Sequence, residues 1–365
     1  MTGRERFLTA ISNGKPDRLP CQVHGWMDYY LKTYLGGCDQ FQAYERFGMD
    51  PVIYAGPVFE YSPADCANWQ AIQEELPPPR PDGRRWRRTV TTPGGTLSCV
   101  YEADPYTTWM AEPLIKSQRD FEIWIRYDPA PIRVDWEPVI HAKRRIGQGG
   151  IVRGGYYNFG QGSCWQSLCM QMGTQEAILA AVDHPRRVHQ ALEAMLAKQL
   201  RVTELGGRIE LDLVETGGGA GSNTVISPAM HEEFCLPYDR RLHEALHAQG
   251  ATVVYHLCGG VMKTLELVAR NRADGLETMT PPSMGGDCDL AEARRRVGGK
   301  LFFIGGFDQN AGFEKGSPAG VRRMVHDLHA CCPEGGYVCC PSDHFFFGDP
   351  ANIQAFADAA RECAY

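Results

Sequence analysis

From Gly150 onward the sequence alternates between short apolar runs and longer segments with helical character. A strand followed each time by a helix builds a parallel sheet, because the helix returns the chain to the same end of the sheet. With about eight candidate strands, such a sheet closes into a barrel. No G-x-G-x-x-G or Walker loop occurs, which disfavours an open nucleotide-binding sheet. We therefore predict an α/β fold, a single (β/α)₈ TIM barrel. The expected strands lie at 151–153, 211–215, 254–256, 274–277, 301–304 and 336–340, and the expected helices at 174–183, 185–205, 228–249, 261–270, 290–297, 318–331 and 350–363.

The N-terminal third adds a helix at 4–13, strand candidates at 21–24 and 51–54, and a segment of different character at 60–110. In that segment, two runs rich in threonine, valine and tyrosine, 89–92 and 96–101, flank Gly94-Gly95, a pattern typical of a β-hairpin. We predict that residues 1–365 form one barrel domain with an N-terminal β-hairpin insertion within 60–110.

Composition narrows the classes of function. The net charge of −7 argues against a nucleic-acid or anionic-membrane partner. No apolar stretch approaches the roughly 18 residues of a membrane span, and the polar N-terminus does not resemble a signal peptide. We therefore expect a cytoplasmic protein. Fourteen cysteines in a chain of this length are then expected to be free thiols rather than disulfides.

The apolar run 251–255 ends in His256-Leu257-Cys258-Gly259-Gly260. A histidine and a cysteine two positions apart on an extended chain point the same way. One imidazole and one thiolate at this spacing can bind a single metal ion, zinc above all. The alternative is a core histidine hydrogen-bonded to a carbonyl group.

Other candidates are expected where strands end, because chemistry in a barrel lies at the carboxyl ends of the strands. Asp308 follows one of these strands, but it could cap the following helix instead of taking part in the site. Cys339 and Cys340 point to opposite sides of a strand, so we expect at most one of them to face the site. The candidate catalytic residues are Glu215, His256 and Asp308; the substrate-binding candidates are His24, Tyr156, Asn158 and His344; the candidate metal ligands are His256, Cys258, Cys340 and Asp343; Glu277 also stands at a strand end.

The sequence resembles the uroporphyrinogen decarboxylase superfamily, and within it the corrinoid-dependent methyltransferase branch. Five segments carry the resemblance across nearly the whole chain: 2–7, 16–20, 226–238, 305–308 and 335–338. The resemblance implies a single barrel domain. Decarboxylases of the superfamily bind porphyrinogen carboxylates through an arginine-rich segment after the first strand, whereas the segment 21–27 here contains no arginine.

The methyltransferase branch carries zinc on a His-x-Cys pair and a later cysteine, so the resemblance implies His256 and Cys258 as ligands. The third ligand is left open between Cys340 and Asp343. The expected function is zinc-dependent transfer of a methyl group between a small substrate and a methylcorrinoid on a separate corrinoid protein. One alternative is a metal-independent decarboxylase or lyase on a small carboxylic acid, with Glu215, Asp308 and His344 as acid–base groups. Another is a non-enzymatic protein that binds a corrinoid or tetrapyrrole.

Overall fold

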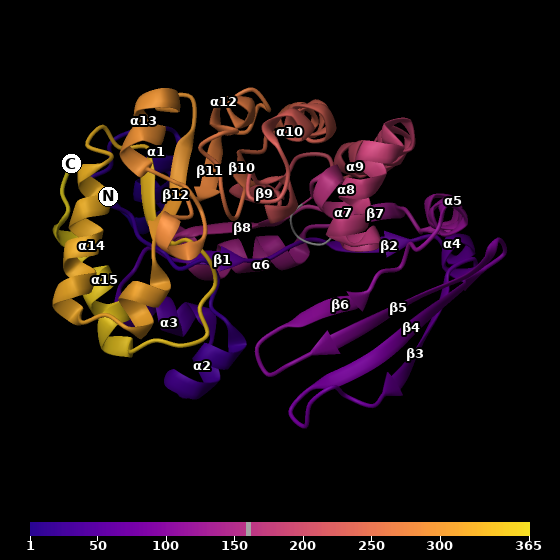
Figure 1. Cartoon of the computed structure of the whole chain (residues 1–365). Coiled ribbons are helices and arrows are strands. Elements are labelled where there is room, and N and C mark those ends of the chain that lie inside the picture. The colour runs from indigo at the N-terminus through magenta and orange to yellow at the C-terminus, as the bar shows by residue number, and fades with distance from the viewer. Residues whose placement is uncertain (158–161) are drawn as a thin grey trace.

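The computed structural model describes residues 1–157 and 162–365, and Figure 1 shows how the elements are arranged. Seven parallel strands form one sheet in the order β1-β8-β9-β10-β11-β12-β13. Most of their side chains are buried, as expected when helices cover the outside of a parallel sheet. The strands are β1 (Val52–Tyr54), β8 (Ile151–Gly155), β9 (Leu213–Gly217), β10 (Val253–His256), β11 (Gly275–Thr278), β12 (Phe302–Phe307) and β13 (Tyr337–Pro341).

The segment around Cys21 joins the two edges of this sheet. On one side, Cys21 forms a parallel bridge with Cys339 of β13, and the Cys339 N–H donates to the Pro20 carbonyl at 2.9 Å. On the other side, the Asp50 N–H, just before β1, donates to the Cys21 carbonyl at 3.1 Å. The segment therefore takes the place of an eighth strand, and the predicted barrel fold is confirmed.

Helices surround the sheet, and three of them (174–183, 185–205 and 290–297) have the predicted bounds. The helix expected at 228–249 is two helices, because Pro237 has no N–H to continue the first one. The helices are α1 (Gly3–Ile11), α2 (Asp28–Tyr34), α3 (Gln40–Phe47), α6 (Glu137–Ile146), α7 (Cys164–Met172), α8 (Thr174–Asp183), α9 (Pro185–Leu205), α10 (Pro228–Phe234), α11 (Leu236–Ala248), α12 (Leu265–Val268), α13 (Leu290–Val297), α14 (Pro318–Ala330) and α15 (Pro350–Glu362), with short turns η1 (Gly147–Gly149), η2 (Gly219–Gly221), η3 (Pro282–Met284) and η4 (Asn310–Glu314).

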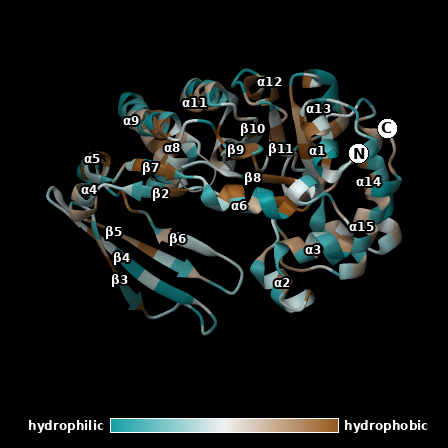
Figure 2. Cartoon of the chain, turned by 180° about the vertical axis from the view of Figure 1, so that it is seen from behind, coloured by the Kyte–Doolittle hydropathy of each residue, from teal (hydrophilic) through white to brown (hydrophobic). Residues whose placement is uncertain are grey.

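Hydropathy follows this layering. In Figure 2 strand β8 is largely brown, whereas the outer helices α9 and α13 carry much teal. Within the described ranges 1–157 and 162–365, no helix combines the length and the apolar character that crossing a membrane requires.

Residues 58–135 depart from the barrel pattern. Strand β2 (Val58–Tyr61) pairs with β7 (Pro131–Asp135), and between them lies a four-stranded antiparallel sheet, which we call the insertion sheet. The predicted hairpin is its central pair, β4 and β5, and the structure adds one strand on each side of it. The outer strand β3 is polar and almost wholly exposed, so it carries no apolar alternation that the sequence could reveal. The elements are α4 (Pro63–Ala67), β3 (Gln70–Leu76), β4 (Arg84–Thr92), β5 (Gly95–Ala103), β6 (Thr108–Glu112) and α5 (Gln118–Tyr127).

The tip of the insertion sheet contacts the carboxyl end of the barrel. Tyr106, in the turn between β5 and β6, lies 4.7 Å from Tyr29 of α2, measured between ring centroids. Its ring also lies 5.4 Å from each of Phe346 and Phe347, in the loop after β13. We call these four rings the aromatic clasp. Both views show this end of the insertion sheet next to α2.

Candidate functional site

An arginine occupies the inside of the barrel. Arg153 of β8 is fully buried, and its Nη2 lies 2.6 Å from Glu215 Oε2 and 2.8 Å from Glu277 Oε1. The guanidinium also lies 4.9 Å from the centroid of the Tyr54 ring. A buried charge is tolerated only when opposite charges are close. Burial alone would raise the pKa of Glu277, but Arg153 and the neighbouring histidines hold it well below its usual range.

His256 links this ion cluster to Cys258. His256 and Glu277 are direct partners on β10 and β11, so both side chains point into the barrel. The Nδ1 atom of His256 lies 3.0 Å from Glu277 Oε1 and 3.7 Å from Glu215 Oε1. Its Nε2 atom lies 2.7 Å from Cys258 Sγ. With a neutral ring, Nδ1–H donates to Glu277 and the Nε2 lone pair faces the sulfur. Burial opposes protonation of His256, but Cys258, Glu277 and Glu215 raise its pKa well above the usual value.

Two further histidines extend this arrangement, His24 beside His256 and His344 beside His24. The His24 ring centroid is 5.1 Å from that of His256 and 4.8 Å from that of His344. His24, His256 and Glu277 each have a possible ligand atom within 4.8 Å of the other two, and among the described residues this is the one such group. Burial lowers the pKa of His24 well below its usual value, so its imidazole is neutral and can bind a metal.

The remaining predicted ligands are placed differently. Cys340 is buried on β13, where its sulfur accepts a hydrogen bond from Gln22 Nε2 at 3.6 Å. Asp343 is partly exposed, and its Oδ1 accepts from the backbone N–H of His344 at 2.7 Å. Neither belongs to the group formed by His24, His256 and Glu277. The role of each as a third ligand stays a prediction.

Two other predicted site residues, Tyr156 and Asp308, do not join this cluster. The Tyr156 hydroxyl donates to the Val202 carbonyl of α9 at 2.6 Å, so it points at a helix. Asp308 accepts from the Ser283 hydroxyl at 2.6 Å and from the Ala311 N–H at 2.9 Å, which is the capping alternative raised from the sequence. Asn158 lies outside the described residues.

Comparison with known proteins decides the family. A model of the family described as Uroporphyrinogen decarboxylase (URO-D) matches residues 160–363, more than half of the chain. The chain belongs to the uroporphyrinogen decarboxylase family. The matched region contains Glu215, His256 and Glu277 of the site, whereas the insertion sheet lies outside it.

Two curated relatives of this family member are both named uroporphyrinogen decarboxylase. The protein from Pseudomonas syringae pv. tomato is 28% identical over 196 residues, and the alignment covers 49% of each chain. The protein from Neisseria meningitidis is 31% identical over 186 residues, covering 47% of this chain and 46% of that protein. The chain thus spans about half the length of the curated relatives it matches.

A solved structure shares the whole fold of this family member. The structure, titled methyltransferase from Methanosarcina mazei, aligns over 99% of both chains with a TM-score of 0.65. The sequences are 13% identical in this alignment, so the likeness concerns the fold.

The sequence did not identify Arg153 as a site residue, and it assigned no role to Glu277. One signal for Arg153 was available, since it is a lone charge between Val152 and Gly154 in an otherwise apolar strand. Its partners lie 62 and 124 positions further along the chain. Only the closed sheet brings Arg153 next to these two carboxylates.

Two cavities open at the carboxyl end of the barrel, on two sides of residues 54–56. One, of about 540 Å³, is lined by Gly25, Tyr54 and His344 together with residues of α2 and the segment after it. The second, of about 580 Å³, lies past the ends of β1 and β8 and is lined by Gly56 and Gly155. The first cavity borders the histidine cluster, because His344 packs beside His24.

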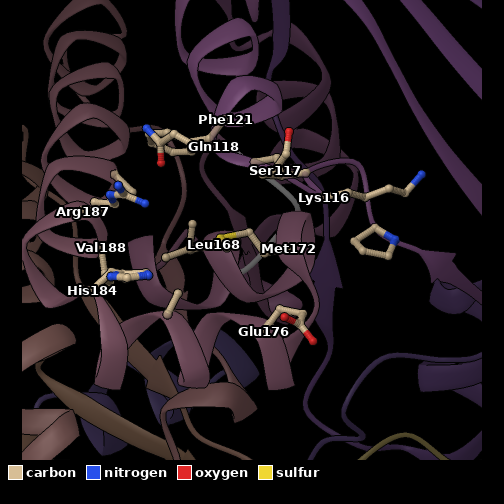
Figure 3. A pocket seen from close by; sticks show the side chains of 14 residues that line it. Lys116, Ser117, Gln118, Phe121, Leu168, Met172, Glu176, His184, Arg187 and Val188 are labelled. Atoms are coloured by element: carbon tan, nitrogen blue, oxygen red, sulfur yellow. The ribbon is translucent and has the colours of Figure 1, made fainter.

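A further cavity of about 380 Å³ lies among α5, α7, α8 and α9. Figure 3 shows Arg187 and His184 on one side of it, Lys116 on the other and Leu168 and Met172 between them. None of its lining residues belongs to the cluster around His256, so this cavity is separate from the site.

Proposed function

We propose that this protein is a zinc-dependent methyltransferase that moves a methyl group between a small substrate and a corrinoid carried by a separate cytoplasmic protein. The observation that carries the proposal is the 2.7 Å approach of His256 Nε2 to Cys258 Sγ, with the His24 ring packed beside that of His256. An imidazole and a thiolate at a strand end suit one zinc ion.

The surrounding residues fit such an ion. Glu277 binds Nδ1 of His256 and so directs Nε2 toward Cys258, which is the usual outer contact of a zinc-bound histidine. Within the described ranges, several buried polar atoms near the cluster have no protein partner, as expected where a ligand binds. These atoms are Gln22 Oε1, the Tyr54 hydroxyl, Arg153 Nε and Nη1, and Glu277 Oε2.

We propose His256, Cys258 and His24 as the zinc ligands, because Cys258 contacts His256 and His24 is a neutral imidazole next to His256. Cys258 lies outside the group formed by His24, His256 and Glu277, so its side chain would have to turn toward the ion. Three protein ligands leave a position for substrate. Glu277 Oε1 already accepts from Arg153 and His256, so its role is positioning. Cys340 and Asp343 remain the alternative third ligands.

The chain's own residues bind and orient the substrate in this proposal. Zinc, when bound, supplies the Lewis acidity that lowers the pKa of a thiol or polarises a methyl-bearing oxygen. Arg153 pairs with both Glu215 and Glu277 inside the barrel. Glu215 then offers a carboxylate near His256 that can accept a hydrogen bond from the substrate. The cavity beside His344 borders the histidines of the cluster.

The second candidate is a metal-independent decarboxylase or lyase on a small acid, and the names of the curated relatives favour it. It would use Glu215, Asp308 and His344 as acid–base groups. Two observations weigh against it. The segment 21–27 contains no arginine, and the charge of Arg153 is already matched by two carboxylates.

The deciding experiment is elemental analysis of anaerobically purified protein. We expect about one zinc per chain in the wild type, with loss of zinc in Cys258→Ala and in His24→Ala. Cys331→Ala, which removes another half-buried cysteine, serves as the matched control and should keep its zinc. Loss in Cys340→Ala or Asp343→Ala instead of His24→Ala would reassign the third ligand. Full activity of metal-free protein would favour the decarboxylase or lyase.

A further inference from the structure

The second cavity at the mouth, of about 580 Å³, lies between the barrel and the insertion sheet. Aromatic rings form much of its wall, and two glycines, Gly56 and Gly155, stand where β1 and β8 end. A Cβ at Gly56 would meet only the Gly155 carbonyl oxygen, at an ordinary contact distance of 3.8 Å. The aromatic residues are Phe59, Tyr61, Trp69 and Tyr157, and the charged ones are Arg88 and Asp128.

Arg88 is a half-buried cation on strand β4 of the insertion sheet. Within the ranges 1–157 and 162–365, no carboxylate lies within 4 Å of its guanidinium, and the segment 158–161 contains no acidic residue. Its neighbour Arg87 points to the opposite face, is exposed, and pairs with Glu74 at 3.5 Å. Arg88 therefore differs from Arg87 in facing a cavity without an acidic partner.

The acid in the same cavity is already engaged. Lys198 of α9 donates to Asp128 Oδ2 at 3.0 Å and to the Asp128 carbonyl at 2.9 Å. This pair balances the charge of Asp128. The cavity is left with the positive charge of Arg88 among aromatic rings, a combination that suits a ligand with both a flat apolar body and a negative charge.

We propose that this cavity binds a small aromatic carboxylate, with its ring against the aromatic wall and its carboxylate on Arg88. A planar carboxylate matches the two parallel N–H groups of one guanidinium, and the ring faces match a flat apolar ligand. Gly56 and Gly155 lie two residues beyond Tyr54 and Arg153 on the same strands, about 7 Å toward the mouth. The cavity therefore adjoins the ends of the strands that carry Tyr54 and Arg153.

This assignment names the substrate class of the proposed reaction, an aromatic acid that bears the methyl group, and rests on the proposed function for that role. The binding step is independent of it, because Arg88 belongs to neither the zinc ligands nor the ion cluster. Binding can therefore be measured without zinc, corrinoid or turnover.

The test is calorimetric titration of the purified full chain with 4-methoxybenzoate. We expect saturable binding to the wild type and at least about tenfold weaker binding to Arg88→Gln, as for loss of a charge-assisted hydrogen bond. Arg87→Gln is the matched control and should bind within about twofold of the wild type. The neutral 4-methoxybenzamide should bind at least about tenfold more weakly than the acid.

Thermal unfolding of Arg88→Gln and Arg87→Gln shows whether both variants are folded. Equal affinity of Arg88→Gln and wild type, or no saturable binding to the wild type, would overturn the assignment. Normal binding of 4-methoxybenzoate to a Cys258→Ala protein that lacks zinc would keep the assignment. A wild type that holds zinc but does not bind 4-methoxybenzoate would refute the ligand assignment and leave the proposed zinc site intact.

Discussion

The guanidinium of Arg153 and the carboxylate of Glu277 meet at 2.8 Å inside the barrel, and neither side chain has any exposed surface. Glu277 connects Arg153 to His256, because the same oxygen that accepts from Arg153 also lies 3.0 Å from Nδ1 of His256. One ion pair thus fixes both the charge inside the barrel and the orientation of the histidine proposed to bind zinc.

Arg153→Met should lower the free energy of unfolding by about 3–5 kcal/mol, because it leaves Glu215 and Glu277 buried without a cation. Chemical denaturation measures this change. Arg145→Met, which breaks an exposed pair with Asp39, is the control and should cost at most about 1 kcal/mol. Equal effects of the two substitutions would show that the buried cluster does not stabilise the barrel.

Glu277→Gln should weaken zinc binding by about 10- to 100-fold, since the amide is a poorer acceptor for Nδ1–H of His256. Competition with a chromogenic chelator measures the affinity. Glu266→Gln removes a carboxylate that pairs with Arg296 at the surface and should leave the affinity unchanged. Unchanged zinc affinity in Glu277→Gln would contradict the positioning role of Glu277.

Gly217→Ala should destabilise the protein by about 1–3 kcal/mol and reduce its zinc content. Gly217 has a φ of +89°, and a Cβ there would lie 2.4 Å from the His256 carbonyl, so the strand would be pushed away from the ligand. Gly149→Ala, where a Cβ meets no atom within 4 Å, is the control. Thermal unfolding and elemental analysis give the two readouts, and a Gly217→Ala protein with full zinc would argue against this packing constraint.

Asp239 provides a prediction about pH. Its carboxylate accepts from the Tyr255 hydroxyl at 2.6 Å and from the Ser163 hydroxyl at 3.1 Å. Burial raises the pKa of Asp239 to about 7, although both hydrogen bonds oppose the rise. The folded protein therefore binds this proton more tightly than the unfolded chain. The resulting stability is fully present below about pH 4 and is lost as the pH rises through about 7.

Asp239→Asn stays neutral, so its melting temperature should fall less than that of the wild type between about pH 5 and about pH 8. Asp358→Asn, at a half-exposed carboxylate that pairs with Arg361, is the control and should follow the wild type. The melting temperatures of the three proteins at both pH values decide the matter. Parallel behaviour of Asp239→Asn and the wild type would contradict the raised pKa.

The sequence predicts those parts of the molecule whose residues carry their own periodicity. Helix α9 has its predicted bounds because its apolar positions repeat over 21 residues and Pro185 marks its start. Strand β3 was not predicted, because it forms by pairing with β4 and has no apolar face that its sequence could reveal. His256 and Cys258 are close in sequence and could be paired at once. Their link to Arg153 depends on the closed barrel, which brings strands distant in sequence together and which the local sequence pattern does not encode.

The aromatic clasp joins a part of the protein outside the family match to a part inside it. Tyr106 belongs to the insertion sheet, outside the matched region, yet its ring touches Phe346 and Phe347, two and three residues after His344. The insertion sheet therefore packs against the loop that carries His344. Sequence changes in the insertion, many residues from the cluster, can tune the position of a histidine at the mouth without altering any residue of the cluster.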